Sequence, residues 1–570
     1  MRRTKLLILI LALSGCNNDT PSSPPSPGPS TSPGPSTSPG PSTSPGPSTS
    51  PGPSTTNNNL SVLKSSTIRT ELDGDNIYLK PTISCEQCVE NKTEITWILD
   101  TNNSHSFGDT LDGKKDVEVT SERALLTLEN YSSKLQLKIN LFNEKNEKSS
   151  FEVAFDRLQA DEIVSTNKAY AALKTDGSVV VWGDAKYGGV LSESLDDVKS
   201  IIANERSFVA LKNDGSVFSW GDEKYGGILN APLNNVESIV ANDSSYAALK
   251  DDGSVFVWGN QEKGGNNNSG YELSDIKDIF SNGNAFAAIK TDGSVIAWGH
   301  AERGGDSSRV SSQLVNIQTI VSTGQAFSAL RKDGVVISWG APDWGGIQYE
   351  YGANSYHDDI MTVNNVSQLY STRSAFSALT KNGSVITWGS QFNGGNMENV
   401  EDSLKDIKMI AGNFCAFAAV NIDGVVTRWG NTDCTDRGFK TIANVKDIVT
   451  NEKAFAGITN DNKVVTWGDR YNGGRTRNIE EKLVDVNQVY SNPVSFVALK
   501  NNGDIISWGS DRFGGGKEDK HVAKVFANTG SFSAIKFDGS VISWGSDHYG
   551  ANHSDVTEEL KPVYIKIPSN

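Results

Sequence analysis

The sequence predicts an all-β protein whose larger part is a β-propeller of about ten three- to four-stranded repeats in a single ring. Three observations predict it. A Trp-Gly pair occurs ten times among the 570 residues, at an average spacing of about 40. An Asx-Gly pair, replaced once by Asp-Asn, starts six residues before each tryptophan. Helical periodicity is absent from these repeats. A fixed period of this length indicates a solenoid or propeller, whose single units cannot fold alone.

Each repeat is expected to form three strands, as in the segment AALKTDGSVVVWGDAKYGG at 171–189. The Asx-Gly pair predicts a hairpin with a type I′ turn, which needs positive φ at both central residues. Another apolar run, such as 198–204, precedes the hairpin. The second and third residues before the tryptophan are nearly always apolar. Because adjacent strand residues face opposite sides, each sheet is expected to lie between two others, as propeller blades do. The glycines that follow Trp-Gly permit a sharp turn between blades.

This phrase resembles the repeat of the regulator of chromosome condensation family, whose units read roughly AL…DG.V..WG.N..GQLG. The resemblance covers about residues 156–570, and the short period with Gly-Gly is closer to the compact bacterial members. It implies a propeller, commonly of seven blades, that acts through protein contacts. Ten units favour one ten-bladed ring. A seven-bladed ring with extra units and an open solenoid are the alternatives. The segment KPVYIKI from Lys561 resembles another opening strand, which would close the ring against the first blade.

The first 59 residues predict an export signal, a lipid anchor and a linker. Basic residues at positions 2, 3 and 5 precede an apolar run at 6–13 that is too short to span a bilayer. The segment LSGC at 13–16 resembles the bacterial lipoprotein signal, which implies cleavage before Cys16 and acylation of that cysteine. A plain secretory signal is the alternative. Asn17, where an Asp often retains such proteins at the inner membrane, favours the outer membrane, on its periplasmic side or its surface. The hexamer SPGPST then occurs five times at 26–55, which predicts a disordered tether.

The predicted organisation has four parts. Residues 1–15 are the signal peptide, and residues 16–59 are the anchor and linker. Residues 60–155 alternate apolar and polar residues in short runs, which predicts an Ig-like β-sandwich with Trp97 as its buried strand tryptophan. Residues 156–570 form the propeller.

Four cysteines remain after Cys16, which permits two disulfides outside the cytoplasm. Cys85 and Cys88 have C-x-x-C spacing. Neither a second ligand pair nor a βαβ context accompanies them, so a local disulfide is favoured over a zinc or redox site. Cys415 and Cys434 lie in one repeat and are a second candidate pair.

Composition narrows the functional classes. The net charge of −16 argues against nucleic acid and against electrostatic binding to anionic lipid. No catalytic motif is present, so we predict no enzymatic activity, no cofactor and no metal site. We also expect a monomer. His548 and His553 lie five residues apart, but solvated loop histidines are favoured over metal ligands there.

The candidate binding residues are those that interrupt the repeat. Aromatic residues five positions after the tryptophan are expected on one rim: Tyr187, Tyr225, Trp344, Phe513 and Tyr549. An insertion after Trp339 adds Tyr349, Tyr351 and Tyr356. Exposed aromatic residues are typical of interaction hot spots, although each could instead pack on its neighbouring blade.

We therefore predict a membrane-anchored envelope lipoprotein whose propeller binds an unknown protein or glycan. A propeller enzyme acting on envelope polysaccharide or protein, and a structural envelope component, are the alternatives.

Overall fold

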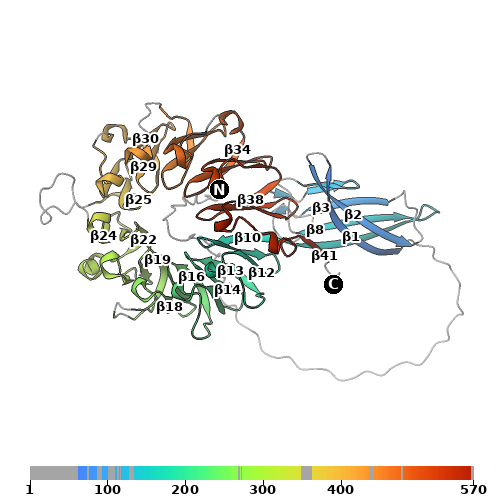
Figure 1. Ribbon diagram of the computed structural model, residues 1–570, viewed down its shortest axis with the longest axis horizontal. Coiled ribbons are helices and arrows are strands. Elements are labelled where there is room, and N and C mark those ends of the chain that lie inside the picture. Colours follow the sequence, from blue (N-terminus) through green and yellow to red (C-terminus); the bar gives the residue numbers. More distant parts are fainter. Residues whose placement is uncertain are drawn as a thin grey trace, which may run out of the picture.

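The computed structural model describes residues 62–73, 76–86, 93–99, 110–111, 114–115, 117–126, 134–267, 270, 272–347, 363–398, 400–435, 441–476 and 479–566. Figure 1 shows two β-structured parts: long strands at one end, and short sheets arranged around a ring at the other. The signal, anchor and linker, including Cys16, lie outside the described residues.

The sandwich consists of two main sheets. The strands in sheet order are β1 (Val62–Asp73), β2 (Asn76–Glu86) and β7 (Ala124–Leu125) in the first, and β41 (Val563–Lys566), β9 (Lys148–Leu158), β8 (Lys134–Phe142), β3 (Thr93–Leu99) and β6 (Val117–Thr120) in the second. A separate hairpin joins β4 (Thr110–Leu111) to β5 (Lys114–Lys115). The predicted strand tryptophan, Trp97, is fully buried beside Leu135 and Leu137, and its Nε1 donates to the Ser121 carbonyl oxygen at 3.0 Å.

The C-terminal strand differs from the expectation. Strand β41 does not join a blade but pairs antiparallel with β9, with Val563 opposite Leu158. The Arg157 side chain, which is fully buried, donates from Nη1 to the Phe537 carbonyl oxygen at 2.8 Å and to the Tyr564 hydroxyl at 3.3 Å. Burial of this guanidinium requires polar partners, and β41 supplies one of them. The last strand therefore fastens the sandwich to the tenth blade.

In the described part of the propeller, ten sheets follow one another in sequence. Their strands are β10 (Ala160–Ser165), β11 (Ala169–Lys174), β12 (Val179–Gly183); β13 (Val198–Ala203), β14 (Ser207–Lys212), β15 (Val217–Gly221); β16 (Val236–Ala241), β17 (Ser245–Lys250), β18 (Val255–Gly259); β19 (Ile276–Ser281), β20 (Ala285–Lys290), β21 (Val295–Gly299); β22 (Ile317–Ser322), β23 (Ala326–Arg331), β24 (Val336–Gly340); β25 (Val366–Ser371), β26 (Ala375–Thr380), β27 (Val385–Gly389); β28 (Ile407–Gly412), β29 (Ala416–Asn421), β30 (Val426–Gly430); β31 (Val445–Thr450), β32 (Ala454–Thr459), β33 (Val464–Gly468); β34 (Val486–Asn492), β35 (Ser495–Lys500), β36 (Ile505–Gly509), β37 (Glu518–Asp519); and β38 (Val522–Ala527), β39 (Ser531–Lys536), β40 (Val541–Gly545). We number these blades 1 to 10. The predicted all-β propeller of repeats is confirmed.

The tenth blade contacts the first blade through hydrogen bonds of the kind that also join other neighbouring blades. The Tyr170 hydroxyl lies 2.9 Å from Ser531 Oγ, as the Tyr246 hydroxyl lies 3.0 Å from Ser207 Oγ between blades 3 and 2. The indole of Trp182 likewise donates to the Gly550 carbonyl oxygen at 3.1 Å. A single ring of ten blades requires this arrangement, and Figure 1 shows β38 beside β10 next to the sandwich.

The hairpin turns are not type I′, as the first blade illustrates. Positive φ occurs at Gly177 (80°) but not at Asp176. Gly177 N donates to the Lys174 carbonyl oxygen at 2.9 Å, which closes a type I turn followed by a glycine bulge. The Asp176 carboxylate accepts from Ser178 N at 3.0 Å and from Ser178 Oγ at 2.6 Å. These bonds explain why the predicted turn type was wrong, because the aspartate side chain caps the turn from its ordinary backbone region.

Candidate binding surface

Each repeat tryptophan stacks on an aromatic residue of its own blade, twelve positions earlier in the chain. The ring centroids lie between 5.1 and 5.5 Å apart. The pairs are Tyr170–Trp182, Phe208–Trp220, Tyr246–Trp258, Phe286–Trp298, Phe327–Trp339, Phe376–Trp388, Phe417–Trp429, Phe455–Trp467, Phe496–Trp508 and Phe532–Trp544. The invariant spacing of twelve was a signal in the sequence that the prediction did not use.

The first glycine of the Gly-Gly pair meets the next blade. Gly188 has φ +89°, and a Cβ placed on it would lie 2.6 Å from the Phe208 ring. Its carbonyl oxygen accepts from Trp220 Nε1 at 3.0 Å. The glycine therefore does more than allow a turn, because it lets the backbone approach the aromatic pair of the following blade.

A short turn after each Trp-Gly, which we call the exit turn, carries the predicted rim residues. The exit turns are η1 (Ala185–Tyr187), η2 (Glu223–Tyr225), η3 (Gln261–Lys263), η4 (Ala301–Arg303), η6 (Pro342–Trp344), η7 (Gln391–Asn393), α1 (Thr432–Thr435), η9 (Arg470–Asn472), η11 (Asp511–Phe513) and η12 (Asp547–Tyr549). The other short turns are η5 (Ser308–Gln313), η8 (Glu401–Ser403), η10 (Glu480–Lys482) and η13 (Ser554–Val556). In blade 2, Asn204 Nδ2 and Ser207 Oγ both donate to the Tyr225 carbonyl oxygen at 2.6 Å. The turn between the first two strands of each blade, the inner turn, thus holds the aromatic residue at the rim.

Four of the predicted rim residues come together with two cations. Lys168 Nζ lies 5.9 Å from the Tyr549 ring centroid and 5.0 Å from that of Tyr187. The Arg206 guanidinium lies 5.2 Å from the Tyr187 ring and 4.7 Å from the Tyr225 ring. The rings of Phe513 and Tyr549 meet edge to face at 5.8 Å. We call this set the aromatic–cation arc: Phe513, Tyr549, Lys168, Tyr187, Arg206 and Tyr225.

All six side chains of the arc are half-buried, so each keeps an accessible part. The sequence prediction named the aromatic residues and missed both cations. Lys168 and Arg206 each stand two residues after the polar residue that opens the inner turn, Thr166 or Asn204. That position faces the exit turns of two neighbouring blades, which only the packing of one blade against the next reveals.

Trp344 belongs to a second, separate group. The Arg373 guanidinium of blade 6 lies 5.5 Å from the Trp344 ring and 4.2 Å from the Phe414 ring. A Cβ on Gly324 would lie 2.8 Å from the Trp344 ring, so this half-buried tryptophan also packs on its own blade. Trp344 therefore contacts Arg373 of the next blade and packs on its own blade, and its expected role in binding stays a prediction. Tyr349, Tyr351 and Tyr356 lie outside the described residues.

Carboxyl groups lie close to the arc. Burial and, to a lesser degree, the nearby Glu205 raise the pKa of Asp243 to about 7, against the opposing effect of Lys263, whose Nζ lies 3.6 Å from Asp243 Oδ2. Burial also raises the pKa of Glu205. Arg206 has a carboxylate of its own, Asp222, at 3.7 Å. The arc is thus an aromatic surface on which nearby carboxylates partly balance the positive charge.

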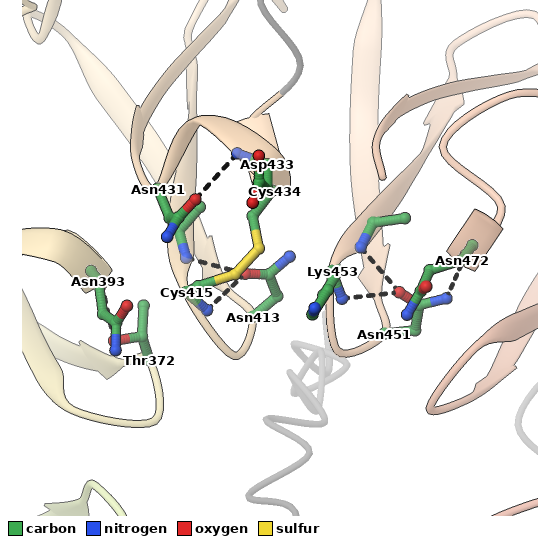
Figure 2. The surroundings of a disulfide bond; sticks show 12 residues. Thr372, Asn393, Asn413, Cys415, Asn431, Asp433, Cys434, Asn451, Lys453 and Asn472 are labelled. Carbon is green, nitrogen blue, oxygen red and sulfur yellow. Dashed lines mark hydrogen bonds between the residues drawn. A yellow bond between two sulfur atoms is a disulfide. The ribbon is translucent and has the colours of Figure 1, made fainter. Parts of the chain in front are cut away.

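A disulfide replaces the usual link between inner turn and exit turn in blade 7. Figure 2 shows it between two neighbours that use hydrogen bonds. Thr372 Oγ1 donates to the Asn393 carbonyl oxygen at 2.9 Å in blade 6, and Asn451 Nδ2 donates to that of Asn472 at 2.6 Å in blade 8. In blade 7 the predicted pair Cys415–Cys434 is bonded, with Cα atoms 6.2 Å apart. Here Asn413 Nδ2, the equivalent donor, is buried and has no hydrogen-bond partner among the residues that the structure describes.

The remaining predicted residues form no further site. Cys85 lies in β2 and is disulfide-bonded, while Cys88 lies outside the described residues. His548 Nε2 lies 2.6 Å from Lys168 Nζ, whereas His553 lies against Trp182 with ring centroids 6.5 Å apart. In the described ranges, no three His, Cys, Asp or Glu residues are grouped in a way that could hold a metal ion. No helix among the residues that the structure describes is long and apolar enough to cross a bilayer.

No family model and no curated protein matches the sequence. Several solved structures are similar to the chain at low identity. Prp20p from Saccharomyces cerevisiae is 17% identical, with 49% of this chain and 81% of that chain covered and a TM-score of 0.28. Human WBSCR16 is 15% identical, with 60% and 99% covered and a TM-score of 0.28. The computationally designed Ika8 protein is 15% identical, with 55% and 96% covered and a TM-score of 0.28. Because these TM-scores are low, the description of the propeller rests on its own sheets and hydrogen bonds.

Proposed function

We propose that this chain is a lipid-anchored envelope lipoprotein whose propeller binds a protein partner through the aromatic–cation arc. The observation that carries the proposal is the continuous series of half-buried aromatic rings with Lys168 and Arg206 between them. Tyrosine and arginine are enriched among residues that contribute most to protein interfaces. The inner turns hold the backbones of the aromatic residues of the arc, so these residues lose little conformational freedom when a partner binds.

The anchor part of the proposal rests on the sequence. Acylation at Cys16 would fix the chain to the membrane, and the linker at 17–59 would let the folded domains reach well beyond it. A binding module benefits from such a tether, because it can search a volume around its attachment point while staying at a high local concentration.

The test is capture of a partner from envelope extract by the full-length chain, compared with the double variant Tyr187→Ala/Tyr225→Ala. We expect the double variant to weaken binding by about 100-fold, since aromatic hot spots contribute about 2 kcal/mol or more. The matched control is Tyr471→Ala. Tyr471 is 59% exposed and lies 4.5 Å from the Arg470 guanidinium in blade 8, outside the arc.

Two results would count against the proposal. Equal capture by the double variant and the wild type would exclude the arc as the binding surface. A captured species that survives protease but not periodate would identify a glycan instead of a protein.

A further inference from the structure

The third strand of a blade has an outer edge that faces away from its own sheet. In blade 2 this edge borders a cavity of about 660 Å³, lined by all five residues of β15 (Val217–Gly221). In blade 5 the equivalent strand, β24, lines another cavity of about 730 Å³ along its whole length. Both cavities thus lie at the same place in the repeat.

In blade 9 the chain itself occupies the space along the outer edge of the third strand, which shows what this space can hold. Strand β37 pairs antiparallel with β36 as a fourth strand, with Glu518 opposite Ile506. Ser507, the residue before the repeat tryptophan, donates from N to the Lys517 carbonyl oxygen at 2.9 Å and accepts from Gly516 N at 3.0 Å. The Ser507 hydroxyl is bonded by the same segment, donating to the Lys517 carbonyl oxygen at 3.1 Å and accepting from Lys517 N at 2.7 Å.

Blade 2 has the same serine without the strand. Ser219 corresponds to Ser507, and its hydroxyl is buried with no hydrogen-bond partner in the described ranges. Within the described part of the chain, its N–H and C=O make no backbone hydrogen bond on the cavity side. A buried hydroxyl left without a partner costs free energy, which an added strand would recover.

The walls of this cavity combine polar residues, such as Ser192 and Asn230, with exposed apolar side chains. Val190 is 62% exposed and Ile228 is 52% exposed, and both line it. Phe218, which occupies the place that Ile506 has in blade 9, also faces it. The lining includes Ala185 of η1, the exit turn that also carries Tyr187 of the arc, although no arc residue itself lines the cavity.

Val217 N donates to the Leu233 carbonyl oxygen at 3.0 Å, so the edge of β15 is occupied at Val217 and open at Ser219. Exposed apolar side chains beside an unpaired stretch of strand edge are typical of a surface that accepts a partner.

We propose that the outer edge of β15 receives an extended peptide segment of a protein partner, which adds to blade 2 as a fourth antiparallel strand. The segment bonds to the N–H, C=O and hydroxyl of Ser219, as Gly516 and Lys517 bond to Ser507. It places an apolar side chain against Phe218, because directly opposite residues of paired strands contact each other. Main-chain bonds supply the affinity in this mode, and the side-chain pocket supplies the specificity.

The test uses the full-length chain and the capped peptide GGGKV, which is the segment 514–518 with valine in place of Glu518. It ends before the position of Asp519, because the Leu233 carbonyl oxygen already holds the equivalent place beside Val217. Hydrogen–deuterium exchange is followed at the amides of Ser219 and Ser507. We expect the peptide at saturation to slow exchange at Ser219 by about tenfold, while Ser507 is protected throughout. The control peptide is methylated on the nitrogen that corresponds to Gly516 N, which removes the donor to the Ser219 carbonyl oxygen, and we expect no protection from it.

Three results would overturn the proposal. These are unchanged exchange at Ser219 with the first peptide, equal protection by both peptides, and protection that grows with protein concentration when no peptide is present. Equal protection would mean that the cavity takes any apolar molecule, and concentration dependence would mean that a second copy of the chain occupies it. The Tyr187→Ala/Tyr225→Ala variant should respond to the peptide as the wild type does, so failure of the arc and failure of this site are distinguishable.

Discussion

The indole nitrogen of Trp220 donates to the carbonyl oxygen of Gly188, 3.0 Å away, across the boundary between the first two blades. Equivalent bonds join Trp258 to Gly226 and Trp508 to Gly473, so the glycine after the exit turn is the point at which one blade holds the next. Each of the four aromatic residues of the arc directly precedes a glycine that accepts such a bond, which links the contact between blades to the position of the arc.

The change Gly188→Ala should therefore destabilise the fold. The residue has φ +89°, and its new Cβ would lie 2.6 Å from the Phe208 ring. We expect a loss of about 3 kcal/mol from backbone strain and overpacking together, measured as a shift of the denaturation midpoint. The matched control is Gly270→Ala, which has φ +73° but nothing within 4 Å of its Cβ. It should cost about 1 kcal/mol, from strain alone; equal losses for both variants would refute the role of the Phe208 contact.

Loss of the Cys415–Cys434 disulfide should destabilise blade 7 more than loss of the equivalent hydrogen bond destabilises blade 8. The double variant Cys415→Ser/Cys434→Ser opens a 19-residue link that no Asn413 Nδ2 hydrogen bond replaces among the described residues. We expect a cost of about 3 kcal/mol in unfolding free energy, against about 1 kcal/mol for Asn451→Ala. Denaturation curves with and without a dithiol reductant test this. A reductant that lowers the stability of the double variant as much as that of the wild type would show that this pair is not responsible.

Stability should depend on pH through Asp243. Because its pKa in the folded protein is raised to about 7, the folded state holds the proton more tightly than the unfolded state does. The wild type should therefore lose stability as pH rises from about 4 to about 7, by up to about 4 kcal/mol relative to Asp243→Asn. Denaturant unfolding of both proteins at several pH values measures this difference.

The control for that experiment is Asp252→Asn. Hydrogen bonds from Ser254 lower the pKa of Asp252, so this carboxylate stabilises the fold above its unfolded pKa and the contribution is lost as pH falls. The pH trends of the two variants relative to wild type should have opposite signs. The same trend in both would contradict the assignment to Asp243.

The change Cys16→Ala should release the protein from the membrane. We expect the wild type in the membrane fraction with label from radioactive palmitate, and the variant without label in the soluble fraction, because the acyl chains supply the anchoring energy. Cys85→Ala is the matched control and should keep both the label and the location. A labelled Cys16→Ala protein, or an unlabelled wild type, would exclude acylation at this residue.

The sequence by itself determined the ten-fold repeat, the hairpins and the apolar faces of the blades. These features depend on interactions within about 40 residues, so the sequence of each repeat specifies them. The aromatic residue twelve positions before each tryptophan is likewise visible in the sequence. The rim aromatic residues were found for the same reason, since the exit turn is local. The turn type was misjudged because the bonds from Ser178 to Asp176 compete with backbone preference.

Only the tertiary structure decided which contacts these repeats make with one another. Arg206 lies between Tyr187 and Tyr225 because two blades meet there, although Tyr187 and Arg206 stand 19 positions apart in the chain. Strand β41 pairs with β9 and not with a blade, since the tenth blade already contacts the first and the sandwich offers a free edge beside the buried Arg157. The open edge at Ser219 and the filled edge at Ser507 belong to nearly identical strands, and what separates them is the path of the chain after each blade. Contacts between units depend on that path, and a repeat sequence does not encode it locally.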